Sequence, residues 1–562
     1  MLNFLNFMPQ KILIAQDIKE LKFLLNSPSK NFKCLPLDLK TQLFCVDKKI
    51  DYFDLLKFSN NELHSRIQND TEKIIDQIDI NYLKVDSFRE EFIGWLRARI
   101  YSIIFLIIII EKINSEDEIK EIIVSGWDSF SDIMSQNNYF LSFMINNIFK
   151  NIKITNITND YEKNKIELDQ KFYSFKKNDV IKKRLILLSS LGYNFKRIFF
   201  WAIKNNYSIL FPVYKKLSFF KKIIYKFLRI HPLEIVSKTT NRKELNISFN
   251  KDLSYRNIPI SNCVFYPSVA LKDVINNYEK QADAINSLFK HYKLDLAVSN
   301  TARGMGGCIL EKASENKVKT LCIPHGTLSG YFNEKDKLYK KIISQAIVPS
   351  FKNKFAVQSK ICENFTKINK INNFVKTGNL IFNESEKRTG NNILYAVTLK
   401  DFHNMQFYGV ETFYEFVDNL KFLNNFSKKI NKKIIVKPHP QEFDSIIYLQ
   451  DQFKNLIFTN EKNSRLFKKI ILTISFSSTI IEDSLYSKVP VILFDRWKRY
   501  QHCYAEKDPS KKNSAIYYID EESNFQKCIN TILDSDQIDF SNFIFSQDSK
   551  NNLDKTLRTF LN

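Results

Sequence analysis

Short apolar runs alternate with helical patterns along most of this 562-residue chain, and this alternation constrains the fold more than any other feature. Apolar runs of about five residues, bounded by turn residues, are typical of strands buried on both faces of a parallel sheet. We expect such strands at 11–15, 42–46, 121–125, 294–298, 320–323, 355–358, 375–377, 393–398, 434–437, 456–459, 470–474 and 491–494. The sequence therefore predicts an α/β protein with doubly wound sheets.

A polar segment separates two such regions. Residues 383–392, NESEKRTGNN, contain no apolar side chain, which is typical of a linker between domains. We expect a first Rossmann-like domain over 1–382 and a second over 393–562. The stretch at about 150–250 is expected to be a helical, basic insertion in the first domain.

The charge is concentrated in that insertion. Of the net charge of +23, twelve Lys or Arg residues and no Asp or Glu lie between Val180 and Leu233, interleaved with aromatic residues. This pattern favours contact with an anionic membrane surface or a polyanionic acceptor, whereas a solvated helical face and nucleic-acid binding are the alternatives. The candidate contact residues of this membrane or acceptor patch are Lys215, Lys216, Lys221, Lys222 and Trp201.

Neither a membrane span nor a metal site is expected from the sequence. The longest apolar run, 100–110, is about half of what a spanning helix needs, so a buried helix is predicted there. The N-terminal residues lack the features of a signal peptide. The eight cysteines show neither a metal-ligand spacing nor a disulfide pattern, which favours a reducing cytoplasm.

The residues that follow two predicted strands of the second domain are suited to binding an anion. Ligands of doubly wound sheets lie outside the carboxyl ends of the strands. After 434–437 comes Lys437-Pro438-His439-Pro440, in which two prolines hold the imidazole in a rigid turn. A structural histidine is the simpler alternative.

A hydroxyl cluster follows the strand at 470–474. Ser477, Ser478 and Thr479 open a helix directly after this strand, and such a start can bind a phosphate. Glu482 lies four residues after Ser478, on the same helical face and about 6 Å along the axis, where a carboxylate can bind ribose hydroxyls. An ordinary capped helix with a solvated glutamate is the alternative.

The third candidate site is rich in glycine. Five of the eleven glycines fall between Gly304 and Gly330, where the backbone must bend sharply or let a ligand approach. Arg303 and Gly304 open a helix after the strand at 294–298, and His325-Gly326 follows the strand at 320–323. The spacing does not match a dinucleotide fingerprint.

Together these motifs resemble a known family. KPHP, S-x-S-S-T-x-x-E and V-P-V-I in the second domain, with PHGT and T-G-N in the first, resemble the GT-B nucleotide-sugar transferases that build bacterial surface polysaccharides. Capsule Kdo transferases, polysialyl- and sialyltransferases, and CDP-glycerol glycerophosphotransferases are the most similar groups. The resemblance covers about 295–495. One departure is Lys488, which replaces the glycine usual two residues before the V-P-V-I proline.

The resemblance implies a role for each candidate residue. His439 would contact the donor phosphate and protonate the leaving nucleotide, with Lys437 beside it. Ser477, Ser478 and Thr479 would hold the phosphate and Glu482 would bind ribose. His325 and Gly326 would face them across the cleft between the two Rossmann-like domains of the GT-B fold. Arg303 and Gly304 are further candidates for donor binding. The family's base is an acid of the first domain, for which Asp128 in SGWDSF is the candidate.

The function that we expect is an inverting, metal-independent glycosyl transfer in capsule or other surface polysaccharide synthesis. A nucleotide sugar, with a CMP-sugar favoured, would donate to a polysaccharide or lipid-linked glycan at the inner face of the membrane, without a cofactor. Alditol-phosphate transfer from CDP-glycerol, with His325 and His439 both catalytic, is the first alternative. A non-catalytic polyanion-binding protein is another, and a sugar-nucleotide epimerase, which shares the fold, ranks lower.

Overall fold

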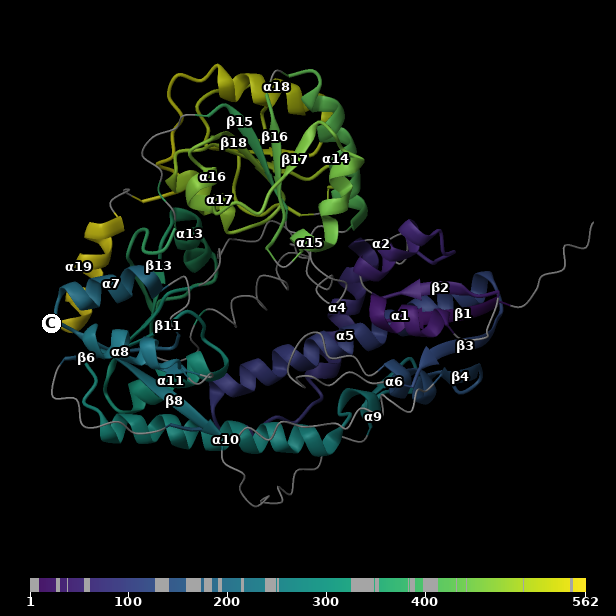
Figure 1. The fold of residues 1–562 in the computed structure, drawn as a ribbon, viewed down its shortest axis with the longest axis horizontal. Helices are drawn as coiled ribbons and strands as arrows, with labels where there is room; N and C mark the ends of the chain where they lie inside the picture. Colours follow the sequence, from purple (N-terminus) through teal and green to yellow (C-terminus); the bar gives the residue numbers. More distant parts are fainter. Residues whose placement is uncertain are drawn as a thin grey trace, which may run out of the picture.

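The structure is a computed structural model, and its described residues form three large, mainly parallel sheets of four, eight and six strands with helices packed around them (Figure 1), together with one short antiparallel pair of strands. It describes residues 10–26, 31–37, 39–54, 61–126, 141–157, 173–175, 184–190, 195–213, 217–237, 249, 252–324, 348, 353–382, 384, 390–397, 413–430, 432–440, 442–498, 500–545 and 549–562. The predicted α/β class is confirmed by the sheets themselves. The domain boundaries proposed at 382 and 393 stay predictions.

The first sheet has four parallel strands in the order β2-β1-β3-β4. They are β1 (Gln10–Ala15), β2 (Lys33–Pro36), β3 (Ile119–Ser125) and β4 (Lys153–Ile157). The helices of this part are α1 (Ile18–Leu25), α2 (Leu39–Lys48), α4 (Asn61–Ile75), α5 (Asp86–Glu116) and α6 (Leu141–Ile148). The strand expected at 42–46 is wrong, because these residues lie in α2. An apolar run this short has the same pattern in a strand and in a buried helix.

The longest helix, α5, carries the apolar run at 100–110. By length and composition alone α5 could cross a membrane, yet 78% of its most apolar stretch is buried inside the molecule. It packs against α4 on one side and against α11 (Gly304–Glu315) on another. Each of the three large sheets, taken with the helices around it, is called a unit below, and α11 belongs to the second unit. The buried helix predicted here is confirmed, and α5 joins the cores of the first two sheets.

The second sheet has eight strands in the order β14-β13-β12-β11-β6-β7-β8-β5. All pairs are parallel except β5 with β8. The strands are β5 (Tyr173–Phe175), β6 (Leu185–Leu188), β7 (Ser208–Val213), β8 (Ile230–Ser237), β11 (Leu296–Ser299), β12 (Lys319–Cys322), β13 (Lys354–Val357) and β14 (Phe374–Lys376).

The expectation of a helical insertion at about 150–250 is therefore corrected. Within it, β6, β7 and β8 are strands of the second sheet, with α7 (Lys196–Lys204) and α8 (Phe219–Phe227) between them. The lysines that made this region look helical lie in and around the two helices, while the short apolar runs between them are buried strands. The remaining elements of this unit are β9 (Ser254–Tyr255), β10 (Ile258–Pro259), α9 (Ser261–Val264), α10 (Ser268–His291) and α13 (Lys360–Ile368).

The third sheet has six parallel strands in the order β17-β16-β15-β18-β19-β20. They are β15 (Asn392–Ala396), β16 (Ile434–Lys437), β17 (Leu456–Phe458), β18 (Ile470–Ser475), β19 (Val491–Phe494) and β20 (Ile516–Ile519). Around them lie α14 (Phe413–Ser427), α15 (Phe443–Ile446), the 3-10 helix η4 (Ile447–Asp451), α16 (Asn463–Leu466), α17 (Ile480–Tyr486) and α18 (Glu522–Leu533).

The helix that follows this third unit, α19 (Ser549–Leu561), packs on the second sheet. Leu553 and Leu557 are buried in the same core as Trp201 of α7, and the Trp201 indole N–H donates a 2.9 Å hydrogen bond to Asp554. Figure 1 shows α19 in yellow beside α7 in blue. The second unit is thus completed by residues that lie beyond the third unit in the sequence.

Candidate functional site

The predicted donor-binding motifs lie at the carboxyl ends of two inner strands of the six-stranded sheet. The strand order reverses between β15 and β18, and ligands of such sheets bind at this switch point, outside the carboxyl ends of the strands. In the register, Ala396 at the end of β15 pairs with Lys437 on one side and with Ser475 on the other. The turns that carry His439 and the hydroxyl cluster therefore leave the sheet from the two strands that flank β15.

In the first of these turns, His439 and Lys437 have different environments. His439 is exposed, and its backbone carbonyl accepts a 2.9 Å hydrogen bond from the Glu442 N–H, which closes the turn. Lys437 is only 8% exposed, and its ammonium donates to the Glu461 carbonyl at 2.9 Å. Burial lowers the pKa of Lys437. His439 can therefore contact a ligand, whereas the buried Lys437 connects the end of β16 to the loop after β17.

The three residues of the hydroxyl cluster also differ in their exposure to solvent. Ser477 is buried, and its Oγ lies 3.0 Å from Nδ1 of His502, which in turn lies 3.4 Å from the Tyr500 hydroxyl. Ser478 is half-buried, and its Oγ accepts a 3.3 Å hydrogen bond from the Ile480 N–H. The next residue, Thr479, is exposed at the start of α17. Ser478 and Thr479 are therefore accessible to solvent, whereas Ser477 is buried against His502.

His502 is a residue that sequence reasoning missed. It lies in the loop after β19, where Asp495 orders the backbone by accepting hydrogen bonds of 2.8 Å from the Tyr500 N–H and from the Tyr518 hydroxyl. No motif or spacing links position 502 to position 477. The position of its loop after a strand of the same sheet is the one signal that the sequence offers.

Glu482 has a protein partner in the other unit. Its side chain is 2% exposed, and it accepts a 2.8 Å hydrogen bond from the hydroxyl of Ser359. Ser359 precedes α13, and its Oγ also accepts from the Cys362 N–H at 3.1 Å, which caps this helix. The carboxylate expected to bind ribose thus connects the six-stranded unit to the eight-stranded one, and its ribose contact stays a prediction.

The departure at Lys488 leaves the local turn intact. Lys488 has a φ of +58°, the left-handed conformation that glycine adopts most readily. Its ammonium lies 4.8 Å from the centre of the Phe540 ring. The lysine therefore adopts the backbone conformation that the usual glycine would supply.

The glycine-rich turn lies at the switch point of the eight-stranded sheet, between β6 and β11. Gly304, with a φ of +60°, opens α11, and a Cβ added there would lie 2.5 Å from a carboxylate oxygen of Glu91. The Arg303 guanidinium lies against Gly94, 3.2 Å from the place of an added Cβ. Glu91 and Gly94 belong to α5, so a helix of the first unit covers this turn.

Glu91 and its neighbour Glu90 are further acidic residues that sequence reasoning did not select. Burial raises the pKa of Glu90, although Arg97 and Arg89 lie close enough to oppose the shift. About 210 residues separate these acids from the turn at Gly304, and no sequence pattern links them. The packing of α5 against α11 brings them together.

Several predicted positions lie outside the described residues. They are Asp128, Lys215, Lys216, His325 and Gly326. The expectation that His325 and Gly326 face His439 across a cleft therefore stays a prediction. Among the residues that the structure describes, no group of three His, Cys, Asp or Glu side chains could hold a metal ion.

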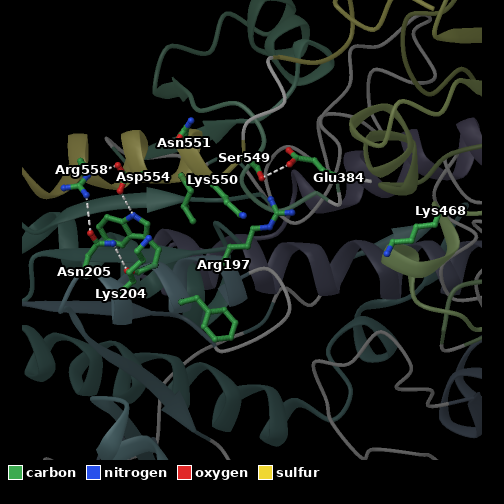
Figure 2. A pocket seen from close by; sticks show the side chains of 13 residues that line it. Arg197, Lys204, Asn205, Glu384, Lys468, Ser549, Lys550, Asn551, Asp554 and Arg558 are labelled. Atoms are coloured by element: carbon green, nitrogen blue, oxygen red, sulfur yellow. Dashed lines mark hydrogen bonds and ion pairs between the residues drawn. The ribbon is translucent and has the colours of Figure 1, made fainter. Parts of the chain in front are cut away.

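A large cavity lies elsewhere, between α7 and α19 (Figure 2). Its volume is about 1260 Å³, and cations from both units line it, with Lys468 on the side of the six-stranded unit. Lys468 precedes β18, so it lies at the amino edge of that sheet, opposite the hydroxyl cluster. Of the residues predicted for function, the cavity contains Trp201, whose side chain is 9% exposed and bonded to Asp554.

Comparison with known proteins identifies distant structural neighbours. No family model and no curated protein matches the sequence. Similar solved structures include the UDP-GlcNAc 2-epimerase of Methanocaldococcus jannaschii, with a TM-score of 0.40 and 13% identity over 67% of this chain and 99% of that one. The UDP-GlcNAc 2-epimerase of Neisseria meningitidis bound to UDP-GlcNAc has a TM-score of 0.37 and 10% identity, covering 67% of this chain and 100% of that one.

A third neighbour is the Anabaena protein HepE in complex with UDP and glucose. Its TM-score is 0.37 and its identity 11%, over 67% of this chain and 99% of that one. Similarities this distant do not identify a reaction for this chain.

Proposed function

We propose that this protein is an inverting, metal-independent glycosyltransferase that uses a nucleotide sugar, with a CMP-sugar as the favoured donor. The acceptor would be a surface polysaccharide, such as a capsule, or a lipid-linked glycan on the cytoplasmic side of the inner membrane. The observation that carries the proposal is the register of the six-stranded sheet. It supports a common site because His439 and the hydroxyl cluster follow the two strands that flank β15 at the switch point.

In this proposal the exposed groups contact the donor. Ser478 and Thr479 would bind the phosphate at the start of α17. The His439 imidazole would donate a proton or hydrogen bond to the departing nucleotide, which lowers the barrier to breaking the bond between the anomeric carbon and the phosphate oxygen. Ser477, held by His502, and Lys437, held by the Glu461 carbonyl, would keep these groups in place.

The acceptor hydroxyl would be deprotonated by a carboxylate of the N-terminal half. Asp128 is the residue proposed from the sequence. Glu91 is a second candidate, because its carboxylate lies against Gly304 at the switch point of the eight-stranded sheet. Attack from the face opposite the leaving nucleotide would invert the anomeric configuration.

The first experiment measures thermal stability with CMP, CDP, UDP and GDP, and then turnover of His439→Ala with the sugar of the nucleotide that binds. A ligand at one hundred times its Kd stabilises the folded protein by about 2.7 kcal/mol, so the preferred nucleotide should be clear. We expect His439→Ala to lower turnover by at least about 100-fold, the size of a lost acid or electrostatic partner. Because the imidazole is exposed, the melting temperature should change little.

His291→Ala, at the end of α10, is the matched control and should keep wild-type turnover. Near-normal turnover of His439→Ala would contradict the assignment of this residue.

The products must also be identified. Transfer of an alditol phosphate, or a changed sugar in the absence of any acceptor, would replace glycosyl transfer by one of the alternative reactions.

A further inference from the structure

Helix α8 has an unusual relation to the core. It lies between β7 and β8 in the chain, and none of its nine residues, all of which are described, is buried. A surface helix ordinarily buries its apolar side chains against the protein and turns its charges to water. In α8, by contrast, the apolar residues lie on the outer side of the helix.

Five large apolar side chains form that outer face. At 100° per residue they fall within an arc of about 140° on the helix. Each is more than half exposed: Phe219 (74%), Phe220 (78%), Ile223 (51%), Ile224 (53%) and Phe227 (87%). A contiguous apolar surface of this kind on a folded protein marks a contact site.

The opposite side of α8 holds the helix on the protein. Tyr225 is half-buried, and its ring lies edge-on to Phe211 of β7 with 5.9 Å between the ring centroids. Leu228, just after the helix, packs against the same core. These contacts fix the rotation of α8 about its axis, so its apolar face points away from the protein.

Lysines flank the outer face. Lys221, Lys222 and Lys226 are all exposed, and the stretch 180–233 contains no acidic residue. An apolar face bordered by lysines matches the boundary between headgroups and acyl chains of an anionic bilayer. Apolar side chains enter there, while the ammonium groups stay with the phosphates. A nucleic-acid groove would use the lysines, but it would leave five large apolar side chains in water.

We propose that α8 is a docking helix that lies in the surface of an anionic membrane. The inserted side chains would be those of the outer face, Phe219, Phe220, Ile223, Ile224 and Phe227. This refines the patch expected from the sequence, since Trp201 faces Asp554 and the core and takes no part in the contact. The proposal does not depend on the reaction that the protein catalyses.

The test is cosedimentation of the full-length protein with vesicles of phosphatidylcholine alone or mixed with phosphatidylglycerol. Each lysine near an anionic surface contributes about a fivefold gain in binding. We therefore expect wild type to bind the mixed vesicles at least tenfold more tightly than the neutral ones. Lys221→Glu with Lys222→Glu should lose at least tenfold, and Phe220→Ser with Phe227→Ser should abolish binding.

Matched controls separate this helix from general charge and apolarity. Lys428→Glu with Lys429→Glu makes the same charge change at an exposed pair on the six-stranded unit, and Tyr504→Ser removes an aromatic ring that is 69% exposed. Both should bind vesicles like wild type, and all variants should keep the wild-type melting temperature because the changed side chains are exposed.

Three results would overturn the proposal. The first is failure of the wild type to bind anionic vesicles. The second is equal binding by the α8 variants and the controls. The third is a wild-type dimer that becomes a monomer in Phe220→Ser with Phe227→Ser, because the face would then be covered by a second copy of the chain.

Discussion

At the scale of single residues, the contact between Glu482 and Ser359 has the most consequences. One hydroxyl caps α13 and at the same time donates to a carboxylate of the neighbouring unit, with both side chains buried. Removing the hydroxyl would leave a buried carboxylate without this donor and a helix without its cap. The contact therefore links the stability of α13 to the way the two units are joined.

We expect Ser359→Ala to lower the free energy of unfolding by about 2–3 kcal/mol, the sum of a lost helix cap and a lost hydrogen bond to a buried carboxylate. Denaturation of the full-length chain by urea measures this change. Ser359→Thr keeps a hydroxyl at the cap and should recover most of the loss. A loss below about 0.5 kcal/mol in the alanine variant would show that the contact contributes little.

Residues of the candidate site could be predicted from sequence where they follow a strand, and not where folding alone brings them together. His439 and the hydroxyl cluster were found because each stands directly after a strand of recognisable pattern. His502, Glu91 and Ser359 were missed because each meets its partner from a distant part of the chain. The helical spacing of Glu482 predicted a contact with ribose. Spacing within one helix contains no information about Ser359, its partner in the neighbouring unit.

At the scale of elements, Glu121 joins three strands of the first sheet. From β3 it accepts a 2.6 Å hydrogen bond from Thr155 of β4, and it pairs with Lys153 at 3.1 Å and with Lys11 of β1 at 3.2 Å. The hydrogen bond from Thr155, followed by those from the two lysines, lowers the pKa of Glu121 to about 2. These partners favour the charged carboxylate, which is present throughout the neutral range.

This lowered pKa predicts a defined pH dependence. The stabilisation is complete above the pKa of about 4.3 that glutamate has in an unfolded chain, and it is lost as the pH falls from there towards 2. Glu121→Gln should therefore be less stable than wild type above about pH 5, and the difference should shrink with acidification. Denaturant titrations across this range measure it. Glu118→Gln, at an exposed site, should follow wild type, and a constant gap between Glu121→Gln and wild type would contradict the prediction.

The strands were predictable wherever turns and helices frame a short apolar run. The runs at 434–437 and 491–494 are β16 and β19, with the predicted bounds. The strands β6, β7 and β8 were missed because their lysine-rich surroundings have the composition of exposed helices. Local composition describes the surface of a unit, whereas the position of a strand depends on the neighbours with which it pairs.

At the scale of the whole molecule, the second and third units are interdependent through α19. Leu557 is fully buried in the core of the eight-stranded sheet, although it follows the six-stranded unit in the chain. We expect Leu557→Ala to destabilise the protein by about 3 kcal/mol, as deletion of a buried leucine side chain does. Chemical denaturation measures the loss. Leu533→Ala, at a leucine that is 41% exposed, should change stability by less than about 1 kcal/mol.

An equal effect of the two leucine variants would contradict the packing of α19 on the eight-stranded sheet. A loss confined to Leu557→Ala would support it. The Trp201 indole, which is bonded to Asp554 of the same helix, gives the experiment a local fluorescence signal.

The same topology has a consequence for biosynthesis. When the ribosome has made the strands of the eight-stranded sheet, α19 does not yet exist, and the whole six-stranded unit must be translated first. At about 5–20 residues per second, the nascent chain spends on the order of ten seconds or more with the surface meant for Leu553 and Leu557 uncovered. During that interval the growing polypeptide offers an apolar patch to chaperones, which the finished protein no longer does.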